Sequence, residues 1–254
     1  MSIDRRQFLL ITAGVAAAGL AGKQTLSVFA ENQARKSDGF AGKRWAMLID
    51  LKKCHENEGC TKCIDACHLT HNVPHFGNKK DEIKWIWKEK FEHAFVEQEN
   101  YFVPEQVKQK PVLLFCNHCS NPPCVSVCPT QATWKRKDGI VMMDWHRCVG
   151  CRYCMAACPY GSRSFNWREP RTHIKQLNPD FPTRTKGVVE KCTFCDERLA
   201  RGLKPACVES CPVKAMVFGD LENPNSEIRK MLGETFTMRR KPELGTQPEI
   251  YYII

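Results

Sequence analysis

Cysteine is the residue type with the greatest chemical potential in this sequence. The 254-residue chain contains 16 cysteines, and all of them fall into four groups of four. The groups are Cys54-x5-Cys60-x2-Cys63-x3-Cys67, Cys116-x2-Cys119-x4-Cys124-x3-Cys128, Cys148-x2-Cys151-x2-Cys154-x3-Cys158 and Cys192-x2-Cys195-x11-Cys207-x3-Cys211. Thiolates at such short spacings are metal ligands, so four metal-binding motifs are predicted.

The third group has the spacing with which bacterial ferredoxins bind [4Fe-4S] clusters, C-x2-C-x2-C-x3-C followed by Pro159. Three thiolates on a tight loop reach three corners of one cubane, whereas the fourth, displaced by a short helix, points to a neighbouring cluster. Pro129, Pro159 and Pro212 follow the last cysteine of three groups and turn the chain out of that helix, and the first group has His68 there. Each group is therefore predicted to serve two clusters.

Short apolar segments repeat around the groups and predict the elements that position them. Residues 46–50 and 140–144 each end in an Asp that three residues separate from the first cysteine of a group. Residues 133–135 and 140–143 are joined through Asp138-Gly139, which is typical of a hairpin. We predict an α+β fold in which a ferredoxin-like unit with a pair of [4Fe-4S] clusters is present twice, with short strands, short helices and long loops.

Other uses of cysteine fit the groups less well. Structural zinc sites pair their cysteines two by two, which only the fourth group resembles. Cysteines this close together in loops are poor disulfide partners. A c-type haem needs C-x-x-C-H, and the Cys63-x3-Cys67-His68 segment is one residue too long. A Rieske centre needs two histidine ligands per cluster, but four complete sets of cysteines leave the eight histidines surplus.

The chain after residue 30 resembles the four-cluster ferredoxin subunits of membrane oxidoreductases, which include the electron-transfer subunits of polysulfide, dimethyl sulfoxide and nitrite reductase systems. The resemblance implies four [4Fe-4S] clusters, with the first motif paired with the fourth and the second with the third. The implied ligand sets are Cys54, Cys60, Cys63 and Cys211 (set 1); Cys192, Cys195, Cys207 and Cys67 (set 2); Cys116, Cys119, Cys124 and Cys158 (set 3); and Cys148, Cys151, Cys154 and Cys128 (set 4). All sixteen cysteines would bind iron.

The same resemblance implies a nested domain organisation. Residues 31–110 together with 171–254 would form an outer ferredoxin-like unit around the first and fourth motifs. Residues 111–170 would form the inner unit around the second and third motifs, which only a hairpin separates.

Four shorter segments look like those of the extracytoplasmic iron–sulfur subunit of the Dsr-type complex of sulfate reducers, also described as a heterodisulfide reductase-like menaquinol oxidoreductase. They are residues 67–74, 82–87, 116–124 and 242–246. The five residues between Cys54 and Cys60 depart from the two that are usual in the family. This longer gap puts the geometry of that corner of set 1 in question.

The first thirty residues have the pattern of an export signal. Arg5 and Arg6 stand just before residues 8–22, an uncharged stretch shorter than the about 20 residues that a bilayer span needs. The pattern resembles a twin-arginine signal, with small residues before a cleavage site after Ala30. We expect residues 1–30 to be this signal peptide, or else a retained membrane anchor. The remaining chain would then lie on the extracytoplasmic (periplasmic) face of the cytoplasmic membrane.

Three further features have competing interpretations. His118, between two cysteines of set 3, either forms a hydrogen bond near a cluster sulfur or faces solvent or a backbone carbonyl. Trp85 and Trp87 alternate with Ile86 as in a strand, and serve core packing, a subunit contact or electron transfer. A group of basic residues forms a solvated face or docks an acidic partner: Lys79, Lys80, Lys84, Lys88 and Lys90.

Net charge bears on the class of partner. The 38 Lys and Arg outnumber the 28 Asp and Glu, and this formal charge of +10 invites nucleic acid as a partner. Removal of residues 1–30 takes away three of the basic and one of the acidic residues and leaves +8. The sixteen thiolates with four oxidised cluster cores add roughly −8, which cancels that charge. We therefore expect no nucleic-acid partner.

Cubanes with four thiolate ligands have no open position for a substrate, and the sequence lacks G-x-S-x-G, P-loop and dinucleotide motifs. The resemblance implies a relay subunit without catalysis of its own, in a hetero-oligomeric membrane complex of sulfate-reduction-type respiration. Its partners would be an integral membrane quinol-interacting subunit, with menaquinol as the quinol, and a multihaem cytochrome c or other redox subunit. A molybdopterin oxidoreductase is the alternative terminal partner, and a zinc-stapled binding module is the alternative class of protein.

Overall fold

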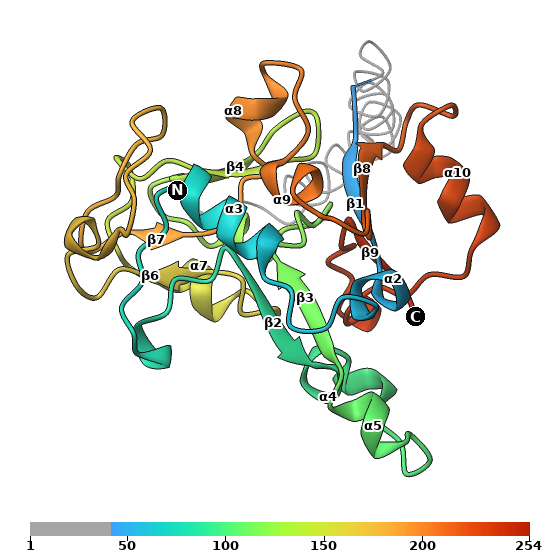
Figure 1. Ribbon diagram of the computed structural model, residues 1–254. Helices are drawn as coiled ribbons and strands as arrows, with labels where there is room; N and C mark the ends of the chain where they lie inside the picture. Colours follow the sequence, from blue (N-terminus) through green and yellow to red (C-terminus); the bar gives the residue numbers. More distant parts are fainter. Residues whose placement is uncertain (1–41) are drawn as a thin grey trace, which may run out of the picture. The chain divides into compact units, whose positions relative to one another are not determined.

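The computed structural model describes residues 42–254, whose helices and strands are all short (Figure 1). The strands are β1 (Trp45–Asp50), β2 (Ile86–Lys90), β3 (Pro111–Phe115), β4 (Thr133–Lys135), β5 (Val141–Met143), β6 (Ser164–Phe165), β7 (Val189–Glu190), β8 (Met216–Asp220) and β9 (Ile250–Ile253). The α-helices are α2 (Leu51–His55), α3 (Lys62–Thr70), α4 (Phe91–Ala94), α5 (Glu105–Lys108), α6 (Pro123–Ser126), α7 (Tyr153–Ala156), α8 (Asp196–Leu199), α9 (Ala206–Glu209) and α10 (Glu227–Glu234). The 3-10 helices are η1 (Lys79–Asp81), η2 (Val96–Gln98), η3 (Arg171–His173) and η4 (Pro242–Leu244). The predicted export signal, residues 1–30, lies outside the described residues.

A three-stranded sheet joins the segment before the first cysteine motif to the segment after the fourth (Figure 1). β1 is the central strand, with Met47 opposite Phe218 of the antiparallel β8 and opposite Ile250 of the parallel β9. Both faces of β1 are buried, because Met47 packs into the main core whereas Leu48 packs against Ile228 of α10. This sheet holds the first and fourth motifs next to each other.

The inner motifs are framed by two small antiparallel pairs. β4 and β5 form the predicted hairpin, with Thr133 opposite Met143. Its turn contains Gly139 at a φ of +85°, a backbone conformation that glycine adopts without steric cost. β6 and β7, of two residues each, pair Ser164 with Glu190 and connect the segment after the third motif to the segment before the fourth.

β2 and β3 form a separate antiparallel ribbon, and the chain between them carries α4, η2 and α5 beyond its end (Figure 1). Trp85, Ile86 and Trp87 at the start of β2 are all buried. The indole Nε1 of Trp85 donates a hydrogen bond to Glu190 Oε2 at 2.8 Å, which satisfies its polar group in the interior. Core packing therefore accounts for both tryptophans.

Residues 43–254 form one unit of short helices and small sheets, which confirms the predicted α+β class. Its main core combines side chains from β1, β2, β3 and β9. Within residues 42–254 no helix is both long and apolar enough to cross a membrane. The division into nested units at residues 110 and 171 stays a prediction.

Candidate metal centres

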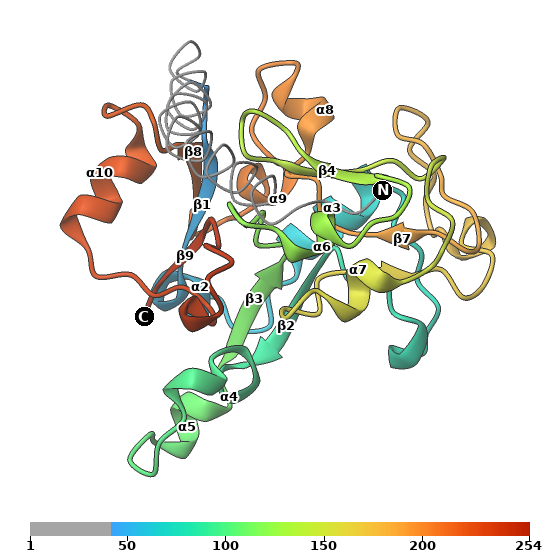
Figure 2. The same ribbon diagram turned by 180° about the vertical axis from the view of Figure 1, so that it is seen from behind.

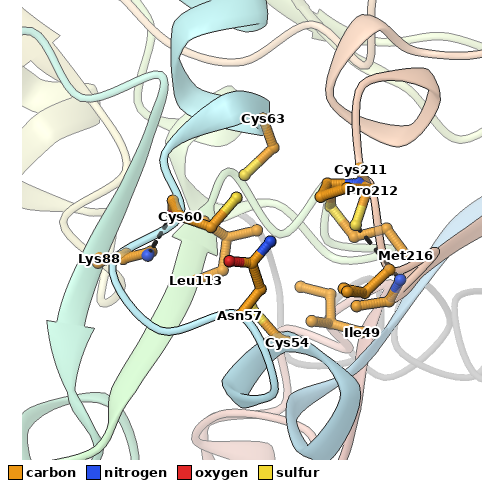
Figure 3. Close-up of a pocket in the computed structure, with 12 residues that line it drawn as sticks. Ile49, Cys54, Asn57, Cys60, Cys63, Lys88, Leu113, Cys211, Pro212 and Met216 are labelled. Atoms are coloured by element: carbon orange, nitrogen blue, oxygen red, sulfur yellow. Dashed lines mark hydrogen bonds between the residues drawn. The ribbon is translucent and has the colours of Figure 1, made fainter.

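Set 1 lines one cavity, to which α2, α3 and the turn after α9 each contribute (Figure 3). Cys54, Cys60, Cys63 and Cys211 all lie in its wall, and the sulfur atoms of Cys60 and Cys63 are directed into it. The apolar part of the wall consists of Ile49, Leu113, Val213, Ala215 and Met216. Burial raises the pKa of Cys63 to about 12, and the charges of Cys54, Cys211 and Cys60 add to the rise. The four thiols are therefore close enough to bind one group.

The long gap after Cys54 does not move either neighbouring thiol out of this cavity. The backbone N–H of Cys60 donates to the carbonyl of Asn57 at 3.2 Å, and Gly59 adopts a φ of +74°. This turn takes up the additional residues, and Asn57 lines the cavity with the thiols. The corner in question is thus a longer loop around a complete set of sulfur atoms.

The residues of the predicted basic face differ in exposure: Lys84 and Lys88 are half-buried. Lys79, Lys80 and Lys90 are exposed, as a solvated face requires. Lys88 instead lines the set 1 cavity and donates from Nζ to the carbonyl of Cys60. Burial raises the pKa of Cys54, and the charge of Lys88 opposes this rise.

Set 3 lines a second cavity, near α6, β5 and the turn after α7. Its four thiols are Cys116, Cys119, Cys124 and Cys158, and the wall also includes Pro122, Pro123, Val141, Tyr160 and Arg163. Burial raises the pKa of Cys119 to about 12. The loop after Cys119 is tied to the C-terminal region, because the backbone N–H of Ser120 donates to the carbonyl of Gln247 at 2.8 Å.

Set 2 combines Cys67 of α3 with three cysteines of the fourth motif. Burial raises the pKa of Cys67 well above its ordinary value, and the largest further contributions come from the charges of Cys195, Cys192 and Cys207. α3 packs against α9, which carries Cys207. These thiols therefore lie together beside the contact between the two helices.

Set 4 is the most exposed of the four. Burial raises the pKa of Cys154 on α7, and the charges of Cys148 and Cys128 contribute to the rise. Burial acts in the same direction on Cys128, but hydrogen bonds from three residues within 130–133 lower its pKa overall. Cys151, in the loop between Cys148 and α7, is the one exposed thiol of the sixteen. The structure thus brings three of these thiols together and leaves the fourth at the surface.

Sets 3 and 4 are neighbours because α6 and α7 lie side by side (Figure 2). α6 carries Cys124 of set 3, and α7 carries Cys154 of set 4. Sets 1 and 2 are neighbours for a simpler reason: Cys63 and Cys67 stand about one turn apart on α3.

His118 is buried, with 1% of its surface exposed, so the solvent-facing interpretation is wrong. Its ring stacks on Phe194 with centroids 3.7 Å apart. Nδ1 accepts a hydrogen bond from the backbone N–H of Val141 at 3.1 Å. Burial holds the pKa of His118 well below its ordinary value, and the charges of Lys191 and Arg163 lower it further. The ring is therefore neutral at physiological pH and carries its proton on Nε2.

Two buried cations beside the thiols are not evident from the motif spacing. Arg163 donates from Nη2 to the sulfur of Cys124 at 3.0 Å, and Lys191 donates from Nζ to the backbone carbonyl of Cys192 at 2.7 Å. The available signal is their position: Arg163 lies between Cys158 and the short strand β6, and Lys191 directly precedes Cys192. A cation within a segment typical of the interior indicates a buried anionic partner.

Comparison with known proteins identifies the class to which these sites belong. Residues 108–176 and 177–221 match a family model described as "4Fe-4S dicluster domain". The Hdr-like menaquinol oxidoreductase iron-sulfur subunit 1 of Archaeoglobus fulgidus is 41% identical over 98% of this chain and 97% of its own length. The chain belongs to the 4Fe-4S dicluster family. The resemblance seen in the sequence is thereby confirmed.

Two further relatives are similar to this chain over most of its length. The menaquinone reductase iron-sulfur cluster-binding subunit of Nitratidesulfovibrio vulgaris is 36% identical over 83% of this chain and 88% of its own length. A tetrathionate reductase subunit of Salmonella typhimurium is 37% identical over 100% of this chain and 89% of its own length. With its sixteen cysteines, the protein carries four [4Fe-4S] clusters and is an iron–sulfur electron-transfer subunit of an oxidoreductase.

The thiol sets fit this dicluster cofactor on chemical grounds. Burial raises the pKa of Cys63, Cys119 and Cys192 to about 12, so four thiolates in one cavity need a compensating positive charge, which iron supplies. Backbone N–H groups also donate to sulfur: Phe194 to Cys192 at 3.4 Å, Ala206 to Cys195 at 3.4 Å and Ala215 to Cys211 at 3.3 Å. Such hydrogen bonds favour the thiolate that iron binds.

Proposed function

We propose that the sixteen thiols hold the four clusters as sets 1 to 4, with the last cysteine of each motif donated to the cluster of the paired motif. The observation that carries this proposal is the cavity of set 1, where Cys211 of the fourth motif joins Cys54, Cys60 and Cys63 of the first. Cys158 lies in the wall of the set 3 cavity in the corresponding way. The nested units, 31–110 with 171–254 around 111–170, follow from the same pairing.

The four sets form a row in the order 1, 2, 3, 4. Sets 1 and 2 share α3, and sets 3 and 4 meet where α6 packs against α7. Sets 2 and 3 meet at the stack of His118 on Phe194, since His118 lies within the second motif and Phe194 within the fourth. This arrangement supports a relay that carries electrons from one end of the row of clusters to the other.

Each cluster, when bound, accepts or releases one electron and offers no open coordination position to a substrate. The residues of this chain keep that environment closed. In set 1 the thiols alternate with Ile49, Leu113 and Met216, and in set 3 Tyr160 and Val141 cover the thiols. These walls limit the access of water to the sulfur atoms, four of whose eight cysteines are buried and four half-buried.

We further propose that the relay works in a membrane-bound complex of sulfate-reduction-type respiration. An integral membrane subunit that interacts with menaquinol would stand at one end, and a multihaem cytochrome c or other extracytoplasmic redox subunit at the other. The support is the near full-length similarity to a menaquinol oxidoreductase subunit and the similarity to a menaquinone reductase subunit. One of these names describes quinol oxidation and the other quinone reduction, so the names do not give the direction of electron flow. The reduction potentials of the clusters set that direction.

A second candidate is a relay for a terminal oxidoreductase of the molybdopterin type. It is favoured by the similarity to the tetrathionate reductase subunit and to the arsenate respiratory reductase iron-sulfur subunit of a Shewanella species, which is 37% identical over 83% of this chain. Affinity purification from the native membrane separates the two candidates. A large catalytic chain would copurify in this case, and a haem-containing subunit in the first.

Anaerobic purification with metal analysis and an EPR-monitored redox titration tests the relay itself. We expect about sixteen iron atoms per chain and four one-electron midpoints with cubane signals. About four zinc atoms without iron would overturn the proposal in favour of the zinc-stapled binding module.

We propose that residues 1–30 direct export by the twin-arginine route, so that the mature protein lies on the periplasmic face of the membrane. The support is the position of Arg5 and Arg6 before an uncharged stretch. Mass spectrometry of the protein from its native membrane is expected to show a chain that begins after Ala30. An intact N-terminus would favour the retained anchor, and replacement of both arginines by lysine, if export persists, would contradict the route.

A further inference from the structure

Arg163 occupies the contact between sets 3 and 4. Its side chain is buried, with 4% of the residue exposed, and Nη2 donates to the sulfur of Cys124 in set 3 at 3.0 Å. Nη2 also donates to Thr133 Oγ1 at 2.8 Å. On the other side, burial raises the pKa of Cys154 in set 4, and the charge of Arg163 and a hydrogen bond from its side chain oppose this rise. One guanidinium therefore faces a ligand of each inner cluster.

Lys191 occupies the corresponding position between sets 2 and 3. It is fully buried, and Nζ donates to the carbonyl of Cys192 in set 2 at 2.7 Å. A second hydrogen bond runs from Nζ to the carbonyl of Val141, which lines the set 3 cavity. Burial lowers the pKa of Lys191, and the charge of Cys116 in set 3 opposes this shift. One ammonium group thus lies between two sets in the same manner as Arg163.

Neither cation forms an ion pair with a carboxylate of the described residues. Burial raises the pKa of Asp196 and the charge of Lys191 opposes this rise, but the ion-pair partner of Asp196 is Arg136 at 3.5 Å. Within residues 42–254, the hydrogen-bond partners of Arg163 and Lys191 are sulfur atoms, a hydroxyl and backbone carbonyls. An isolated charge in the interior is strongly destabilising, so a buried cation requires a buried anion nearby. The thiolate-ligated clusters are the anions that these positions provide, and their negative charge grows when an electron is added.

We propose that Arg163 and Lys191 are fixed cations at successive junctions of the relay, each of which raises the reduction potentials of the two clusters that it faces. This inference rests on the proposed function and deepens it. Arg163 acts on the clusters of sets 3 and 4, and Lys191 on those of sets 2 and 3. The set 3 cluster therefore feels both charges and the set 1 cluster neither.

The pattern of affected potentials makes the proposal testable. Arg163→Met and Lys191→Met remove each charge but retain a side chain of similar length and apolar character. We expect each variant to lower two of the four midpoints, with the reduced-to-oxidised ratio at the wild-type midpoint falling about tenfold, or about 59 mV for a one-electron couple. One midpoint falls in both variants and one in neither. The measurement is an EPR-monitored titration of the complete chain, with iron content determined on the same sample.

Matched variants separate charge from packing. R163K and K191R retain the charge and are expected to keep midpoints nearer to those of the wild type than the methionine variants do. K230M removes an exposed cation on α10, outside the cavities of sets 1 and 3, and should leave all four midpoints unchanged.

Three results would overturn the inference. The first is a pair of methionine variants that keep about sixteen iron atoms and wild-type midpoints. The second is a lysine or arginine variant whose midpoints fall as far as those of the methionine variant. The third is loss of iron from both methionine variants, because the cations would then serve assembly rather than potential. None of the three results contradicts the proposed relay function of the wild-type chain. A wild-type chain without four cubane midpoints would refute the proposed function itself.

Discussion

Cys207 and Cys211 stand four residues apart on and just after α9, yet their surroundings differ. Cys211 lines the cavity of set 1. Burial raises the pKa of Cys207, and the charge of Cys192 in set 2 adds to this rise. A separation of four residues along a short helix directs the two sulfur atoms to different clusters, as in the ferredoxin motif.

We expect Cys211→Ser to remove or convert the same cluster as Cys60→Ser, although the two residues are far apart in sequence. Serine is a poorer ligand for iron than a thiolate, so about four iron atoms per chain are at risk in each variant. The missing midpoint in the EPR titration identifies the cluster. Cys207→Ser is the matched control and should lose the midpoint that Cys192→Ser loses. A common midpoint lost in C211S and C207S would contradict the cross-ligation.

The sequence predicts the cysteines well because motif spacing is a local property that the cluster itself imposes. It does not predict the side chains that arrive from other motifs. The ring of Phe194, from the fourth motif, stacks on His118 and contributes to its burial. The neighbours of Arg163 come from α6 and β4, so its role depends on long-range packing that one motif does not encode.

At the scale of elements, the loop before α7 depends on one close approach. Gly150 has a φ of +72°, and a Cβ atom there would lie 2.4 Å from the carbonyl oxygen of Gly187. Gly161 has a similar φ of +63°, but a Cβ atom there would meet nothing within 4 Å. Alanine at either position would strain the backbone, but only alanine at position 150 would also clash. A comparison of the two variants therefore distinguishes the two effects.

We expect Gly150→Ala to lose the cluster of set 4, and about four iron atoms per chain, because the 150 loop must move away from residue 187. Gly161→Ala should retain all four clusters and lose only about 1–2 kcal/mol of stability from the left-handed backbone. Iron content and the set 4 midpoint are the readouts. Equal iron content in the two variants would show that the close approach does not matter.

A buried ion pair ties two distant segments together. Arg184 Nη2 lies 2.6 Å from Glu190 Oε2, and both side chains are fully buried. Arg184 also donates to the carbonyls of His71 and Asn72, just after α3, and lies over the ring of Trp85. This pair connects the end of the first motif to the approach of the fourth.

Arg184→Met should destabilise the protein by about 3–5 kcal/mol, because it leaves Glu190 as an uncompensated buried charge. The denaturant midpoint for loss of visible cluster absorbance measures the effect. Arg171, paired with Glu169 at 3.9 Å on the surface, is the control, and R171M should cost less than about 1 kcal/mol. The R184M/E190Q double variant should recover part of the loss. Equal denaturant midpoints for R184M and R171M would refute this role of the buried ion pair.

Elements near the motifs could be predicted because they repeat in the sequence and pair locally, as β4 and β5 do. Other elements could not. The parallel pairing of β9 with β1 joins Met47 to Ile250 across almost the entire chain. β6 and β7 have two residues each, too few to show any alternation. Long-range pairing and very short strands therefore limit what the pattern reveals.

For the whole molecule, the size of the helices and sheets leads us to expect that the clusters contribute much of the stability. The longest described helix, α3, has nine residues, and most sheets are two-stranded. Helices and ribbons of that size are marginal in water without further packing. The four sets of thiols connect segments that these elements alone hold weakly.

Removal of iron with a chelator under reducing conditions should therefore unfold the described chain. We expect the near-ultraviolet and far-ultraviolet circular dichroism to fall together with the iron content, as in other metal-dependent folds. Reconstitution with iron and sulfide should restore both signals. Native circular dichroism in a chain with less than about one iron atom would contradict this expectation.

Exposure differs along the row of clusters, and this difference decides how the isolated chain ages in air. Cys151 is the one exposed thiol, while the ligands of set 2 are buried except for the half-buried Cys192. Oxygen and peroxide attack the ligands that they can reach, so oxidative damage should begin at set 4 and advance inward. A timed exposure to air should show the set 4 midpoint disappearing first, with a transient chain of about twelve iron atoms. Earlier loss of the set 2 cluster would exclude this order. In the expected order, the clusters are lost from one end of the row.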